Sequence, residues 1–107
     1  MVSENTAEII DGTKEYELTI IVNPQMEEEP LNNLVDTITR YITEHEGTVS
    51  KLEPRGKRKL AYPIKHLLEG HYVFIEYTGK PSINKELKAN MEISEDILRH
   101  LIILKGS

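Results

Sequence analysis

Hydrophobic residues in this chain repeat with a period of two in some segments and with a helical period in others, and the order of these segments limits the fold. Six segments follow in the order strand, helix, strand, strand, helix, strand: 16–22, 30–46, 48–64, 70–79, 81–93 and 97–105. Two strand–helix–strand halves with right-handed crossovers form a four-stranded antiparallel sheet. We therefore predict an α+β, ferredoxin-like βαββαβ domain with two helices on one face of the sheet and an open opposite face.

The clearest strand is the stretch GHYVFIEYTG, in which polar and apolar positions alternate. Val73, Ile75 and Tyr77 point to one face of this strand, and Tyr72 and Phe74 point to the other. We expect the helices to cover the first face. Tyr72 and Phe74 then project from the open face.

Apolar neighbours are expected around Tyr72 and Phe74 on the open face. We predict that these neighbours are Ile21 from the first strand and Ile102 and Leu104 from the last strand. An apolar patch of this kind usually marks an interaction site. It could stack RNA bases, dock a protein, or be a plain half-exposed sheet surface. The third strand lacks the basic, glycine-containing pattern of RNA-stacking sheets, so we favour a protein partner.

Proline and glycine residues indicate where the segments end. Pro30 is expected at the first helical position and Gly47 at the stop of the same helix. The second strand is expected to bend around 54–56, and a turn is expected from His66 to Gly70.

Length and composition indicate one domain in a reducing compartment. The chain has 107 residues, which is enough for one hydrophobic core of ordinary size. It has no cysteine, which fits a reducing compartment. We predict a flexible N-terminal arm over 1–14 and a single domain over 15–107. The first residues lack the basic start and apolar core of a signal peptide, and no apolar run is long enough to span a membrane. The expected location is the cytoplasm.

Positive charge is concentrated in one part of an otherwise acidic chain. The formal net charge is −5, yet residues 51–65 contain six basic side chains and one acidic one. A charged hairpin needs no ligand, but a run as dense as Arg-Gly-Lys-Arg-Lys is better explained by contacts with phosphates. An anionic partner responds to the electrostatic potential of the surface that it contacts, and not to the net charge of the whole chain.

Catalytic and metal-binding chemistry finds little support in the sequence. The loop after the first strand, NPQMEEEP, has no glycine and three glutamates, so it is unsuited to holding phosphate. The histidines do not have the helical spacing of a zinc site; they are His45, His66, His71 and His100. We therefore predict no enzymatic activity, no catalytic residue, no metal site, no cofactor and no small-molecule substrate.

Three stretches of the sequence resemble one family. They are YELTIIVNP (16–24), RGKRKLAYPIKHLLEGHYVFIEY (55–77) and ILRHLIILK (97–105). In the bacterial small-subunit ribosomal protein number six family, the first strand likewise begins with Tyr-Glu and ends in Asn-Pro. The second strand of that family carries a glycine, basic residues and then Leu-Ala-Tyr-x-Ile. The match spans 15–105 at the same spacings, although this chain has about fourteen residues before the first strand, more than the family usually has.

The resemblance implies a structural role in the small ribosomal subunit. Family members have the ferredoxin-like fold and no catalytic activity. They bind small-subunit ribosomal RNA as a heterodimer with the small-subunit protein number eighteen, in the subunit's central platform. The partner face would then be Tyr72, Phe74, Ile102 and Leu104. The RNA contacts, assigned by charge and position, would be Arg55, Lys57, Arg58, Lys59, Arg99 and Lys105.

The alternative is a regulatory or protein-interaction module of the same fold. ACT-like domains bind small ligands near strand-to-helix loops, usually at dimer interfaces. The corresponding loops here lack obvious ligand-binding glycines. Tight binding of a metabolite by the isolated chain would favour this alternative.

Overall fold

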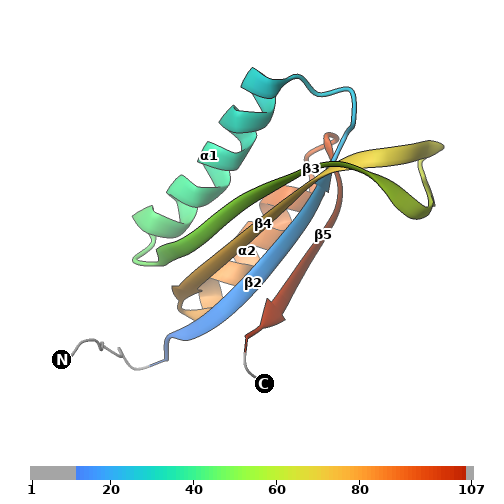
Figure 1. Ribbon diagram of the computed structural model, residues 1–107. Coiled ribbons are helices and arrows are strands. Elements are labelled where there is room, and N and C mark those ends of the chain that lie inside the picture. Colours follow the sequence, from blue (N-terminus) through green and yellow to red (C-terminus); the bar gives the residue numbers. More distant parts are fainter. Residues whose placement is uncertain (1–11, 106–107) are drawn as a thin grey trace.

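The computed structural model describes residues 12–105 and contains six secondary-structure elements (Figure 1). They are β2 (Lys14–Val22), α1 (Glu28–Glu44), β3 (Thr48–Ile64), β4 (Leu67–Gly79), α2 (Pro81–Glu92) and β5 (Ile97–Leu104). This order confirms the predicted βαββαβ fold. The predicted arm over 1–14 falls mostly outside the described residues, and Lys14 already belongs to β2.

The four strands form one sheet in the order β3-β4-β2-β5, and every neighbouring pair is antiparallel. Figure 1 shows α1 and α2 together on one side of this sheet. In the part of the chain that the structure describes, no helix covers the other side. The sheet therefore has the predicted open face.

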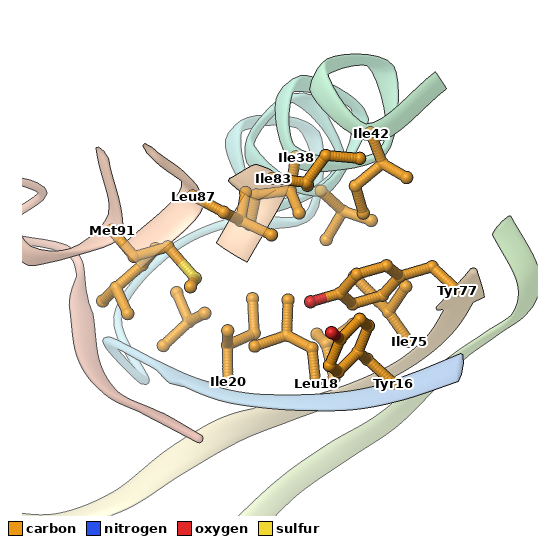
Figure 2. Packing of buried hydrophobic residues seen from close by; sticks show 14 residues of the cluster. Tyr16, Leu18, Ile20, Ile38, Ile42, Ile75, Tyr77, Ile83, Leu87 and Met91 are labelled. Carbon is orange, nitrogen blue, oxygen red and sulfur yellow. The ribbon is translucent and has the colours of Figure 1, made fainter. Parts of the chain in front are cut away.

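The core fills the space between the helices and alternate residues of the two central strands (Figure 2). The most deeply buried side chains are Leu18, Ile20, Val22, Ile42, Val73, Ile75, Tyr77, Leu87 and Met91. Each aliphatic side chain buried this way contributes about 1.5–3 kcal/mol. The predicted facing of Val73, Ile75 and Tyr77 toward the helices is confirmed.

The hydroxyl of Tyr77 lies in this core and has a hydrogen-bond partner there. The Tyr77 hydroxyl donates a hydrogen bond to Oδ1 of Asn84 on α2, and the Tyr77 ring lies 5.5 Å from that of Tyr16. Burial raises the pKa of the Tyr77 hydroxyl far above its ordinary value, with a smaller contribution from Tyr16. The phenol therefore stays neutral and ties β4 to α2.

The ends of α1 differ from the prediction in their details. The helix begins at Glu28, so Pro30 lies within the first turn, where its missing N–H would have no partner. It ends at Glu44, and Glu46, with φ of 71°, takes the left-handed conformation expected for Gly47. Gly47 is needed instead for close packing, since a Cβ there would lie 2.7 Å from Cγ2 of Ile42 and 2.9 Å from its carbonyl oxygen.

The β3–β4 hairpin is long and bends where the sequence predicts. The pairing register shifts between Pro54 and Gly56, and Gly56 has φ of 83°. This β-bulge confirms the predicted bend. The predicted turn over 66–70 is wrong, because Lys65 and His66 form the turn with φ of 51° and 69° and β4 begins at Leu67. Past the bulge the hairpin extends beyond the end of β2, as Figure 1 shows.

Candidate partner and RNA interface

The open face of the sheet carries an apolar strip across three of its four strands, β4, β2 and β5. Cross-strand partners share a face, and the register pairs Ile21 with Tyr72 and pairs Thr19 with both Phe74 and Leu101. The strip therefore consists of Ile21, Tyr72, Phe74, Leu101 and Ile103. Leu101 is 57% exposed and Ile103 is 47% exposed. The predicted positions of Ile21, Tyr72 and Phe74 on the open face are confirmed.

The predicted positions of Ile102 and Leu104 on the open face are wrong. Ile102 is the cross-strand partner of buried Leu18 and packs against the core, and Leu104 is the partner of buried Tyr16. Both residues therefore lie on the helix-covered face. The open face presents Leu101 and Ile103 in their place, which sequence reasoning missed.

Three arginines lie over aromatic rings at the hairpin end of the open face. The guanidinium carbon of Arg55 lies 4.4 Å from the centre of the Phe74 ring, and that of Arg58 lies 6.0 Å from the Tyr72 ring. Arg99 of β5 lies 5.3 Å from the Tyr62 ring and donates a 2.8 Å hydrogen bond to its hydroxyl. Cation–π contacts at exposed sites contribute about 0.5–1 kcal/mol each.

Tyr62 does not have the role that its position in the Leu-Ala-Tyr-Pro motif suggests. A buried tyrosine there would pin the strand to the sheet, but the Tyr62 side chain is more than half exposed. It holds Arg99 against the open face from the projecting hairpin. Sequence separation of 37 residues hides this contact, so no local pattern could have revealed it.

Glu53 anchors the arginine end of the open face. Its carboxylate accepts hydrogen bonds from Arg55, at 3.0 Å from Nη2, and lies 3.4 Å from the Lys51 ammonium. The hydrogen bond from Arg55 lowers the pKa of Glu53, and Lys51 acts in the same direction. Because the group is exposed, this cluster orients Arg55 more than it stabilises the fold.

The opposite end of the open face is acidic. Glu15, Glu17 and Glu76 share this face, because Glu17 pairs with Glu76 and Glu15 pairs with Thr78. The ammonium of Lys105 donates a 3.1 Å hydrogen bond to the Glu76 carboxylate. This hydrogen bond raises the pKa of Lys105. Lys105 is thus engaged by a carboxylate and lies apart from the arginines.

The six predicted RNA-binding residues do not form one surface. Arg55, Arg58, Arg99 and Lys105 lie on the open face. Lys57 is paired with His71, the cross-strand partner of buried Val22, and therefore points to the helix side of the sheet. Lys59, two residues further along β3, points the same way.

Comparison with known proteins decides the family. A family model described as ribosomal protein S6 matches residues 15–104. The small ribosomal subunit protein bS6 of Heliobacterium modesticaldum is 36% identical over 92 residues, which cover 86% of this chain and 96% of the relative. That of Exiguobacterium sibiricum is 39% identical over 89 residues, which cover 83% and 94%. The chain belongs to the ribosomal protein S6 family.

The structural comparison agrees with this assignment. The crystal structure of 30S ribosomal protein S6 from Thermotoga maritima matches with a TM-score of 0.82 at 31% identity, over 87% of this chain and 88% of that one. As a member of the S6 family, the chain is a constituent of the small ribosomal subunit, in the cytoplasm, and not an enzyme. The regulatory ligand-binding alternative is set aside on this ground.

Residues 12–105 offer neither a cluster of metal ligands nor a membrane-spanning helix. These residues contain no group of three histidine, aspartate or glutamate side chains placed to hold a metal ion. Neither described helix has the length and apolar character needed to cross a membrane.

Proposed function

We propose that this chain binds small-subunit ribosomal RNA as a heterodimer with the small-subunit ribosomal protein number eighteen. In this proposal the partner docks on the open face and RNA contacts the basic β3–β4 hairpin. The proposal follows the family resemblance, and one structural observation carries it. Leu101 and Ile103 are about half exposed, on the same face as the arginine–aromatic pairs, and no helix within residues 12–105 covers this face.

The composition of the open face suits a protein partner. Aromatic residues and arginine are enriched in the buried centres of protein interfaces, and both occur here beside exposed aliphatic side chains. The acidic end with Glu15 and Glu17 complements a basic partner. Such a partner would also supply the positive charge that this chain lacks.

The charge of the chain explains why RNA binding requires the partner. A formal net charge of −5 repels RNA as a whole, and only the hairpin concentrates positive charge. RNA affinity depends on the number of phosphates neutralised. A chain with few free cations therefore binds RNA weakly by itself and strongly only when a basic partner adds contacts.

The test is a binding titration of RNA from the subunit's central platform. It uses the full chain alone, the partner protein alone and their equimolar mixture, at several salt concentrations. We expect the chain alone to bind roughly a hundredfold more weakly than the mixture. The affinity of the mixture should fall steeply with salt, because phosphate contacts release counterions.

Two results would contradict the proposal. The first is failure of the chain to form a complex with the partner protein at any salt concentration. The second is equal RNA affinity for the partner with and without this chain, which would show that the chain contributes nothing to RNA binding.

A further inference from the structure

The basic run of residues 55–59 is divided between the two sides of the sheet. Arg55, two residues after Glu53, lies over Phe74 on the open face, and the residue that the bulge at Pro54–Gly56 adds to β3 changes the side of the residues that follow. Beyond the bulge the alternation resumes, so Arg58 pairs with Gly70 on the open side. Lys57 and Lys59 then fall on the helix side. Neighbouring charges in the sequence therefore face different surroundings.

The two arginines are already engaged within the chain. Arg55 is held by the Glu53 carboxylate at 3.0 Å and by the Phe74 ring at 4.4 Å. The Arg58 Nε donates a 3.3 Å hydrogen bond to the carbonyl oxygen of Arg55. These contacts fix both guanidinium groups against the open face, where the partner is proposed to dock. Moving them toward a phosphate elsewhere would break these contacts.

The two lysines are exposed and have no such engagement. Within residues 12–105, no ion pair or hydrogen bond involves the ammonium of Lys57 or Lys59, although Glu69 is the cross-strand neighbour of Lys59. The described register of β2 ends at the pair Val22–His71, so Lys57, opposite His71, lies level with the end of β2, and Lys59 lies beyond it on the projecting hairpin. Two free ammonium groups at the base of the hairpin are suited to reach a phosphate backbone.

A hollow lies beside Lys59 along the projecting hairpin. Its volume is about 610 Å³, and its lining includes Pro24, Lys59, Ala61, Pro63, His66 and Leu67. A hollow of this size, mostly apolar with a few polar groups, can hold a group as large as a nucleotide. Its wall carries the ammonium of Lys59 and the carboxylate of Glu69, so an occupant could place an anionic group at Lys59 only on the side away from Glu69.

From this arrangement, and resting on the proposed function, we infer that the lysines and the arginines of the basic run bind different partners. Lys57 and Lys59 bind RNA phosphates on the helix side of the hairpin. Arg55 and Arg58 belong to the protein-partner surface on the open face. The bulge at Pro54–Gly56 separates the two functions by placing Arg58 on the same side as Arg55.

The experiment compares two charge-matched variants of the full chain, Lys57→Gln with Lys59→Gln and Arg55→Gln with Arg58→Gln. Each variant removes two positive charges from the same strand. A third variant, Lys85→Gln with Lys88→Gln on the exposed surface of α2, removes two charges outside both surfaces. Two quantities are measured: affinity for the partner protein without RNA, and affinity of the preformed heterodimer for platform RNA across salt concentrations.

The lysine variant should bind the partner protein as the wild-type chain does. Its heterodimer should bind RNA about tenfold or more weakly, and the slope of log affinity against log salt should fall by about two. The arginine variant should lose about tenfold in partner affinity and keep the wild-type salt slope once the heterodimer is saturated. The α2 variant should match the wild-type chain in both measurements.

The inference is overturned if the lysine variant keeps the wild-type RNA affinity and slope. It is also overturned if the arginine variant lowers the RNA slope as much as the lysine variant, which would place RNA on the open face. Both results require that the wild-type heterodimer binds RNA. If the wild-type proteins form no heterodimer, or the heterodimer binds no RNA, the proposed function itself fails and the inference fails with it.

Discussion

Replacing Leu101 and Ile103 together with lysine (L101K and I103K) is expected to weaken binding to the partner protein about a hundredfold, or about 2.7 kcal/mol. The substitution removes two exposed aliphatic side chains from the open face. It also adds positive charge where a basic partner is proposed to dock. The measurement is a titration of the variant with the partner protein, without RNA.

The fold of this variant should survive. Both positions are exposed in the free chain, and a lysine at position 103 would face Glu17 across the strands. Exposed substitutions of this kind change the free energy of unfolding by about 0.5 kcal/mol or less. A matched control replaces Leu52 and Ile93 with lysine, since both are exposed aliphatic residues outside the open face. Equal loss of partner binding in both variants would show that the open face has no special role.

Replacing Ile20 with alanine is expected to lower the free energy of unfolding by about 2–5 kcal/mol. Ile20 is completely buried beneath the helices (Figure 2). Its truncation leaves a cavity that the surrounding side chains fill only in part. This is a large share of the total stability of a domain, which is about 5–15 kcal/mol. Denaturant unfolding monitored by circular dichroism gives the measurement.

The matched control is the same substitution one residue further along β2. Ile21 points to the open face and is only partly buried, so Ile21→Ala should cost about 1 kcal/mol. Ile21→Ala should, however, weaken partner binding. Ile20→Ala should leave partner binding unchanged as long as the Ile20→Ala variant remains folded. A larger stability loss for Ile21→Ala than for Ile20→Ala would mean that the two sheet faces have been exchanged.

The sequence predicts a strand's facing only where polar and apolar residues alternate along it. In β4, polar and aromatic residues separate Val73, Ile75 and Tyr77, so its buried face could be assigned correctly. In β5 the run Leu101 to Leu104 is apolar on both faces. The sequence pattern therefore does not show which of these residues point to the helices. Pairing with β2 determines which residues of β5 face the helices, because it places Ile102 opposite buried Leu18. Information from the partner strand was therefore required.

The sequence could not predict which basic residues of 55–59 share a side of the sheet, for a related reason. Strict alternation would place Arg55 on the same side as Lys57 and Lys59. The bulge before Gly56 shifts the alternation by one residue, so that Arg58, and not Lys57, shares the side of Arg55. The sequence does predict a bend at this glycine, but not which charges would change sides. That depends on how β3 pairs with β4.

The hairpin turn was misplaced because its residues carry no turn signal. Lys65 and His66 both have positive φ, a conformation usually taken by glycine or asparagine in two-residue hairpin turns. Gly70, which attracted the prediction, lies inside β4, where a Cβ would come within 2.5 Å of the Ile21 side chain. Its glycine is required for close packing across the sheet and not for a turn.

In the proposed function the partner protein covers the open face and RNA contacts the hairpin. Hydrogen–deuterium exchange of the wild-type chain tests it most directly, in three states: free, bound to the partner protein, and bound to partner and platform RNA. We expect slower exchange in β5 when the partner is added. We expect a further slowing over residues 57–65 only when RNA is added. Unchanged exchange in β5 on adding the partner, or slowing of β5 that appears only when RNA is added, would contradict the proposed function.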